Sequence, residues 1–418
     1  MSYPVCVFSG MESNEFFYTY EGKDPNVDTI KSCGSFDCRC NHANKLANNI
    51  CSRCLAVFYC SRECQTADFS EHKKICKQIS KAREKASALE IALRGGPIPT
   101  WDENHYVNWS NQRIDYFNEK YLGDWWGHLD PRDYCRAVWK VTDLLREVAW
   151  DYECEAIWEE CLNLKLELLR NNVGDNQGIR HEVPEVLLYL NRDDDCVKFI
   201  KWWAYNYEYW YKPGYGAESD ANLKKLWQKG EFIYNETGDV TRFDDIYPMF
   251  DEEGNKIALD SSGVQRNRFS DNYEISNCLD HLIALVCIKM RVVAHLEAQQ
   301  CSLLKLDSNA DITNIATKIT VQIKLLDKYL HMAHKHNKYI LHVLSSENNI
   351  RKMREQGRPE YYGLDSTEEA YLAMEKFMRC IARAWGLPYI GKFLTKIGAT
   401  VTPDLNYRRR DRNGTPLI

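Results

Sequence analysis

The sequence lacks a hydrophobic run long enough to cross a membrane. Its best apolar stretch, residues 282–286, is followed within a few positions by Lys289 and Arg291, whereas a membrane-spanning helix needs roughly 18 or more apolar residues in succession. The first residues also lack the basic segment followed by an apolar one that marks a secretory signal. We therefore expect an intracellular protein, in the cytoplasm and/or the nucleus, with no membrane attachment.

Several motifs of nucleotide and acyl chemistry are absent as well. The chain has no Gly-x-Gly-x-x-Gly fingerprint, no phosphate-binding Gly-Lys-Ser/Thr and no Gly-x-Ser-x-Gly nucleophile elbow. The chain therefore lacks the standard sequence signatures of dinucleotide-binding, P-loop and α/β-hydrolase enzymes. The sequence therefore assigns no catalytic residue.

Cysteine, by contrast, is abundant and unevenly placed. Of the 17 cysteines, nine lie at or before Cys76 and eight are scattered over the remaining residues. Dense clustering at short spacings, without an export signal, favours metal binding over a disulfide framework. The scattered eight fall mostly in helix-like patterns, where a cysteine behaves as a small buried apolar residue.

Charge is divided as unevenly as cysteine. Residues 31–85 contain eleven Lys or Arg and five Asp or Glu, a local net charge of +6, while the whole chain carries −6. The rest of the chain therefore carries −12. A basic segment on an acidic body is not typical of a dedicated nucleic-acid-binding protein, whose basic surface would dominate.

The clustered cysteines fall into pairs whose spacing suits a shared metal ion. Cys51-x-x-Cys54 is a knuckle, in which two thiolates from one turn reach the same tetrahedral zinc. Two further pairs are four residues apart, which places both side chains on one face of a helix: Cys60 with Cys64, and His72 with Cys76. With two more ligands, these pairs would form two closed four-ligand sites, which are typical of structural zinc.

This pattern resembles the MYND zinc finger. The run Tyr59-Cys60-Ser61-x-x-Cys64-Gln65, followed by Asp68, His72 and Cys76, reproduces the second half of the family's motif. The resemblance implies a small cross-braced finger with two structural zinc ions. One zinc would be held by Cys51, Cys54, His72 and Cys76, and the other by Cys60, Cys64 and the two earliest cysteines of the motif.

The earliest ligands depart from the family's pattern. Family members usually open with Cys-x-x-Cys, whereas this chain offers Cys38-x-Cys40, with Cys33 and His42 as competitors. We assign Cys38 and Cys40 because the gap from Cys40 to Cys51 is suitable.

The resemblance also implies a peptide-binding groove. In the family, an exposed groove near this Gln and the aromatic residue takes short peptides rich in Pro and Leu, partly as an added β-strand. Gln65 and Phe69 would line it here, although the family usually has Trp where this chain has Phe69, which lacks the indole donor. The implied function is a protein–protein interaction adaptor in transcription or chromatin regulation, with nucleic acid not expected as a partner and the oligomeric state left open.

Beyond the finger, helical periodicity predicts a mainly α-helical body of hairpins that resemble tetratricopeptide-type repeats. Helices are expected over 73–93, 133–148, 152–170, 185–190, 197–203, 273–297, 315–344 and 366–385. The predicted organisation is an N-terminal segment (1–32), the finger (33–80), a helical region (81–213), an insert or loop (214–270), a second helical region (271–395) and a mobile tail (396–418).

An enzyme remains the alternative. SET-type lysine methyltransferases carry this finger, but they need a glycine-rich segment before it and an Asn-His-Ser-Cys-like motif after it, and the chain has neither. An iron-dependent hydroxylase could use His128, Asp130 and His181, yet the helical pattern between these residues is incompatible with the β-barrel such a site requires. An enzyme with an unrecognised site stays open.

Three further features have ordinary interpretations. His331, His334, His336 and His342 are expected on a solvated helix face, and Asp193-Asp194-Asp195 are expected to cap a helix. Two bursts of aromatic residues, at 101–126 and 202–211, are expected to pack between helices, with an aromatic-lined peptide groove as the alternative.

Overall fold

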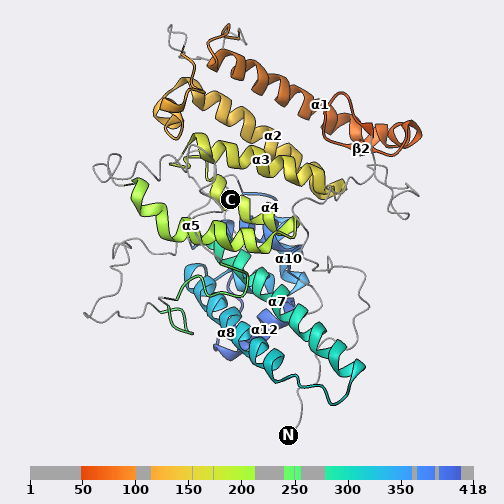
Figure 1. The fold of residues 1–418 in the computed structure, drawn as a ribbon, viewed down its shortest axis with the longest axis vertical. Coiled ribbons are helices and arrows are strands. Elements are labelled where there is room, and N and C mark those ends of the chain that lie inside the picture. The colour runs from red at the N-terminus through yellow and green to blue at the C-terminus, as the bar shows by residue number, and fades with distance from the viewer. Residues whose placement is uncertain are drawn as a thin grey trace. The chain divides into compact units, whose positions relative to one another are not determined.

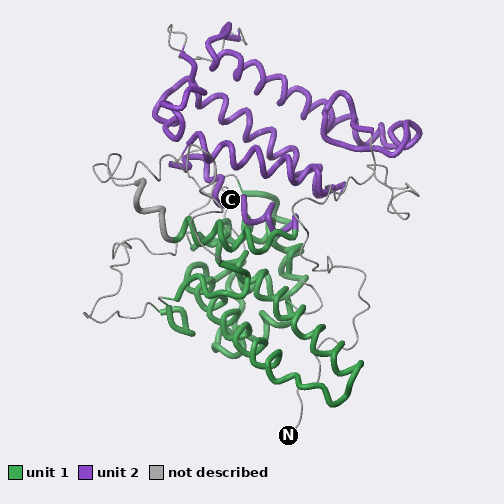
Figure 2. The backbone as a smooth tube through the Cα atoms, in the orientation of Figure 1, with its two compact units in different colours: residues 1–22, 191–208, 237–418 green, residues 23–190, 209–236 purple. Residues whose placement is uncertain are grey.

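The computed structural model describes residues 49–99, 114–152, 154–172, 174–211, 240–248, 250–255, 278–359, 365–381 and 386–405. The chain divides into two compact units (Figure 2). One unit comprises residues 23–190 and 209–236, and the other comprises residues 1–22, 191–208 and 237–418. Both are mainly helical, as the sequence predicts.

The unit that contains the cysteine-rich segment is a short β-ribbon followed by a layer of helices. Its elements are β1 (Asn49–Ile50), β2 (Phe58–Tyr59), α1 (Arg62–Leu93), α2 (Asp130–Tyr152), α3 (Glu155–Asn171) and α4 (Val183–Tyr189). Figure 1 shows α1, α2 and α3 side by side, and successive helices contact one another from α1 to α4. The connection between α2 and α3 is so short that these two helices form an antiparallel hairpin.

Helix α2 shows why this layer forms. Its apolar residues recur every three or four positions, so that one face is buried; this face includes Val138, Val141, Leu145 and Val148. Burying each such side chain contributes roughly 1.5–3 kcal/mol. The same layer also buries charge: Arg146 of α2 donates to both carboxylate oxygens of Glu185 in α4, at 3.0 and 2.9 Å.

The second unit is built around a helical hairpin. Its helices are α5 (Asp193–Tyr211), α7 (Leu279–Leu306), α8 (Thr313–His336), α9 (Ile340–Leu344), α10 (Glu347–Glu355), α11 (Thr367–Phe377) and α12 (Gly386–Lys396). Helices α7 and α8 pack along each other, and α9 contacts α8, α10, α11 and α12. All five residues of α9 are buried, so this short helix is the centre of the C-terminal bundle.

Part of the predicted insert belongs to the core of this unit. Lys289 of α7 donates to the backbone oxygens of Arg242 and Asp244 at 2.8 and 2.9 Å, and to the side chain of Gln322 at 2.9 Å. Ile246 and Tyr247 are buried. Three acceptors match the three N–H donors of an ammonium group, which accounts for a lysine in this interior.

Several predicted helix limits were wrong. α1 begins at Arg62 instead of residue 73, and the long helix expected over 315–344 is broken at Asn337, whose side chain accepts from the backbone N–H groups of Tyr339 and Ile340. The helix expected to reach residue 385 ends at Phe377, and the sequence prediction missed α10 and α12. Ser366 does cap α11, because its hydroxyl accepts from the Glu369 N–H.

The expectations for the histidines and the acidic triplet were also wrong. His336 and His342 are buried, and the His336 ring lies 3.0 Å from Glu369, so they do not form a solvated face. Asp193, Asp194 and Asp195 occupy the first turn of α5 rather than its cap. Asp193 is fully buried and accepts from Arg291 of α7 at 2.8 Å.

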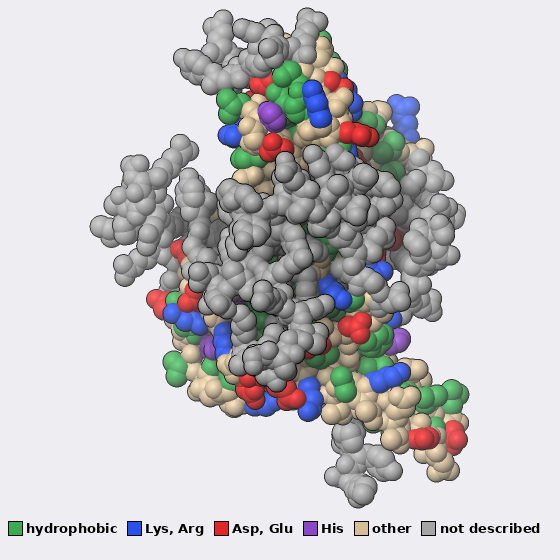
Figure 3. Space-filling view, turned by 60° about the vertical axis from the view of Figure 1, so that its left-hand side comes forward, with side chains coloured by type: hydrophobic (Ala, Val, Ile, Leu, Met, Phe, Trp, Pro, Cys, Tyr) green, Lys and Arg blue, Asp and Glu red, His purple; other side chains and the backbone are tan. Residues whose placement is uncertain are grey.

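The described aromatic residues are mostly core residues, as expected. Trp125 is fully buried against the rings of Phe117 and Tyr134, and Trp202 and Trp203 are buried in the second unit. On the face of the molecule drawn in Figure 3, lysine and arginine side chains are interspersed with aspartate and glutamate. No helix within the described ranges combines the length and the apolar character that a membrane span requires.

Glu297 of α7 makes the stability of the second unit depend on pH. Burial raises the pKa of its carboxyl to about 7, above the value of about 4.3 in an unfolded chain. The folded state therefore binds more protons between these two values, and stability falls as pH rises from about 4.3 to about 7.

We expect Glu297→Gln to remove this loss of stability at higher pH, because glutamine does not ionise. The variant should be more stable than the parent at pH 8, with a difference that shrinks toward pH 4.5, as measured by urea unfolding across the pH range. Glu355 is the last residue of α10, and Glu355→Gln is the control variant. Parallel curves for the parent and Glu297→Gln would contradict the prediction.

Candidate metal centre

The first two candidate ligands lie in a tight turn between β1 and β2. The Cys51 N–H donates to the Val57 oxygen at 2.9 Å, and the Leu55 N–H donates back to the Cys51 oxygen at 2.9 Å. Leu55 has a φ of 53°, the left-handed conformation that a non-glycine residue adopts at a cost. This reversal of the chain brings Cys51 and Cys54 to the same side of the turn.

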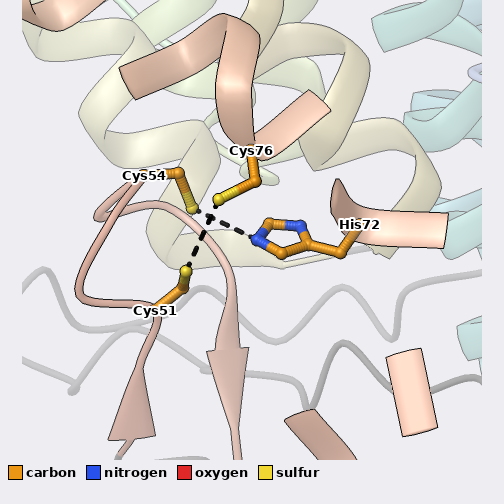
Figure 4. Close-up of side chains that lie close together, drawn as sticks. All are labelled: Cys51, Cys54, His72 and Cys76. Carbon is orange, nitrogen blue, oxygen red and sulfur yellow. Dashed lines mark hydrogen bonds between the residues drawn. The ribbon is translucent and has the colours of Figure 1, made fainter. Parts of the chain in front are cut away.

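Helix α1 supplies the other two candidate ligands. Ser61 caps the helix by accepting from the Cys64 N–H, and His72 and Cys76 follow one turn apart on the buried face. Figure 4 shows all four side chains converging between the turn and the helix. Cys51 Sγ lies 3.8 Å from Cys76 Sγ, and Cys54 Sγ lies 3.5 Å from His72 Nε2.

The four donor atoms fit a tetrahedral zinc ion. With Zn–S near 2.3 Å and Zn–N near 2.0–2.1 Å, a tetrahedron has S···S edges of about 3.8 Å and S···N edges of about 3.6 Å. The two measured separations agree with these edges, and all four donors lie within 4.8 Å of one another. Because all four residues are buried and fill the four positions, the site suits structural zinc, which keeps no position for a substrate.

The second predicted site is partly described. Cys60 Sγ and Cys64 Sγ lie 3.4 Å apart, with Cys60 at the end of the β-ribbon and Cys64 in the first turn of α1. Only Cys64 is therefore helical, contrary to the expectation from the four-residue spacing. Cys38 and Cys40, and their competitors Cys33 and His42, lie outside the described residues.

The predicted peptide-binding residues are neighbours on α1. Gln65 is half-buried, and Phe69, one turn later, has 57 % of its surface exposed. The Lys73 ammonium lies 5.8 Å from the centre of the Phe69 ring. Ile50 of β1 and Leu55 of the turn are also exposed, so the cysteine-rich segment presents several apolar side chains to solvent.

The sequence places Tyr59 and Asp68 in the motif but does not predict the hydrogen bonds that polar residues make around the ligands. Asp68 is buried on α1 and accepts from Tyr59 at 2.6 Å and from Tyr152 of α2 at 3.2 Å. Burial raises the pKa of the Asp68 carboxyl, against the opposing effect of the two tyrosine hydroxyls.

Arg83, two turns beyond Cys76 on the same helix, reaches back to the ligand turn. It donates to the backbone oxygens of Cys54 and Leu55 at 2.9 and 3.3 Å and pairs with Glu160 of α3. The Arg83–Glu160 pair spans 77 positions of sequence, so no local signal could have predicted it.

The candidate hydroxylase ligands do not form a metal site. Within the described residues, potential metal-binding side chains come together in one group, that of Cys51, Cys54, His72 and Cys76. Asp130 instead accepts from the Tyr116 hydroxyl at 3.2 Å, and the His128 ring packs on Tyr116 and Tyr121.

Comparison with protein families identifies the cysteine-rich segment. Residues 36–76 match the family model of the MYND finger. This part of the chain is therefore a MYND zinc finger domain, and the helical body follows it. No solved structure matches the chain.

Proposed function

We propose that this chain is a zinc-dependent interaction adaptor, whose MYND finger binds a short Pro/Leu-type peptide of a partner protein. The observation that carries the proposal is the exposed Phe69 on the finger helix. A large aromatic side chain that is left exposed beside a closed metal site supports a docking role, since aromatic residues dominate the energetics of interfaces. MYND fingers are commonly protein-interaction modules, which agrees with this assignment.

In this proposal the two zinc ions have structural roles. Cys51, Cys54, His72 and Cys76 hold one ion, and Cys38, Cys40, Cys60 and Cys64 hold the other. The finger is too small to bury a core of its own, so metal binding supplies its folding free energy.

The peptide surface combines the finger helix with the β-ribbon. Gln65 offers amide hydrogen bonds and Phe69 an apolar wall, while β1 and β2 form the kind of small sheet to which a peptide can add as a further strand. The helical body, with its antiparallel α2–α3 hairpin in the manner of helical repeats, would supply a second surface. The family resemblance extends the proposal to complexes in transcription or chromatin regulation.

A peptide titration tests the groove. We expect Phe69→Ala to weaken binding of a synthetic Pro/Leu-rich peptide by about 10–30-fold, roughly 1.4–2 kcal/mol, with unchanged zinc content. Phe69→Trp should strengthen binding, because it adds an indole donor. Ile91→Ala is the matched control, since Ile91 lies on the same helix and is 52 % exposed. Equal affinities for the parent and Phe69→Ala would refute the groove.

Partner capture tests the adaptor role. The intact chain and a Cys60→Ala/Cys64→Ala variant would be used as bait, and the proteins lost with the variant would be identified. If every captured partner is retained by the variant, the finger is not the docking element.

A further inference from the structure

The zinc-ligand turn is held by a residue outside the finger motif. Arg83 lies beyond the matched residues 36–76, yet its guanidinium donates to the backbone oxygen of Cys54, itself a ligand, and to that of Leu55. Both oxygens belong to the turn in which Leu55 adopts its left-handed conformation. A planar guanidinium presents its donors in a fixed geometry, so Arg83 can hold this strained turn in the shape that ligation needs.

Arg83 is in turn fixed by the helical body. Its two terminal nitrogens pair with the two carboxylate oxygens of Glu160 in α3, at 2.6 and 2.9 Å. A bidentate pair of this kind gives orientation as well as energy. The position of α3 therefore sets the position of the guanidinium, and through it the position of the ligand turn.

A second connection runs parallel to the first. Asp68 of α1 links the Tyr59 hydroxyl of β2 to the Tyr152 hydroxyl of α2. The Tyr152 ring also lies edge-on to the ring of His72, with centres 6.4 Å apart. Two helices of the body therefore reach the metal centre through side chains. Tyr152 of α2 contacts the ligand His72 directly, and Glu160 of α3 acts through Arg83.

We propose that Arg83 is a positioning residue that couples the metal centre to helix α3, so that zinc retention and the packing of α3 are thermodynamically linked. The proposal goes beyond peptide docking and would hold for any partner. Linkage is reciprocal: weakening the contact with α3 should loosen zinc, and removing zinc should loosen α3. Binding or loss of zinc in the finger would then change the stability of α3 in the body.

Site-resolved zinc release tests the first half. The full chain is challenged with a chelator and an alkylating reagent, and mass spectrometry follows modification of Cys51, Cys54 and Cys76. We expect Arg83→Ala to accelerate their modification about 10–100-fold, the usual effect of losing a residue that orients metal ligands. Arg83→Lys should give a modification rate between those of the parent and Arg83→Ala, because lysine keeps the positive charge but lacks the planar set of donors of a guanidinium.

Matched variants separate positioning from general destabilisation. Glu160→Gln frees the guanidinium from α3 but leaves its bonds to the turn, and should accelerate release by a smaller factor. Glu185→Gln weakens another Arg–Glu pair between helices of this unit, which joins α2 and α4 away from the ligand turn. Equal acceleration by Glu160→Gln and Glu185→Gln, or none by Glu160→Gln and Arg83→Lys, would overturn the proposal, even if Arg83→Ala fails to fold.

Hydrogen exchange tests the reciprocal half. In the parent, chelation should increase exchange of the amides of α3, whereas in Glu160→Gln the same treatment should change α3 less. Exchange of α3 that does not respond to chelation in the parent would refute the linkage. Because neither measurement uses a peptide, failure of the linkage would leave the docking proposal standing, and the reverse also holds.

Discussion

Removal of zinc, or replacement of His72 by Ala, is expected to unfold residues 49–76. Before α1 begins at Arg62, this segment has only two two-residue strands. Half of its eight buried residues are the four metal ligands, and the others are Ala56, Val57, Tyr59 and Asp68. Apparent binding free energies of structural zinc are about 10–16 kcal/mol at neutral pH, comparable to the stability of a whole domain. Hydrogen exchange of the full chain, before and after chelation, should show protection lost across the segment.

A pair of cysteine variants provides the control. Cys54→Ala removes a ligand, whereas Cys135→Ala removes an equally buried thiol from α2. Within the described residues, Cys135 does not belong to the one group of side chains placed to share a metal ion. We expect only Cys54→Ala to lower the zinc content and the protection of residues 49–61; identical behaviour of the two variants would contradict the assignment.

The sequence is most informative where the determining contacts are local. The knuckle spacing of Cys51 and Cys54 and the one-turn spacing of His72 and Cys76 predict shared faces, and the structure brings these four side chains together. Ser366 followed three residues later by Glu369 predicts a helix start in the same way. Such signals depend on a few neighbouring residues, which a single sequence contains in full.

The start of α1 was missed for a physical reason. Helix prediction relies on apolar residues at regular spacing, but the buried face of the first part of α1 consists of Asp68, His72 and Cys76. Metal ligation and hydrogen bonds to tyrosines replace apolar packing there, so the usual pattern is absent. The alternative signal was Ser61, a favoured N-cap residue at the boundary.

Contacts between distant segments could not be predicted at all. Arg83 looks like any charged residue of a basic helix, and its role depends on Glu160, which lies far along the chain. His336 was expected in solvent because its neighbours include Lys335 and Lys338, yet Glu369 and Asn337 enclose it in a buried hydrogen-bonded group. In both cases a polar side chain is held in place by a partner that the local sequence does not reveal.

Buried ion pairs of this kind predict the second large effect. Arg146→Ala is expected to destabilise the finger-containing unit by about 3–5 kcal/mol, because it leaves Glu185, which is fully buried, without the Arg146 Nε that donates to both of its carboxylate oxygens. Arg136→Ala on the same helix is the control: the Arg136–Asp133 pair is exposed, and such pairs contribute about 0–1 kcal/mol. Chemical unfolding followed by circular dichroism would measure both. Because Glu185 links α4 to α2, the loss of stability should appear first as increased hydrogen exchange in α4. Similar stabilities of Arg146→Ala and Arg136→Ala would contradict the prediction, because they would show that the unit tolerates a buried Glu185 that has lost its arginine partner.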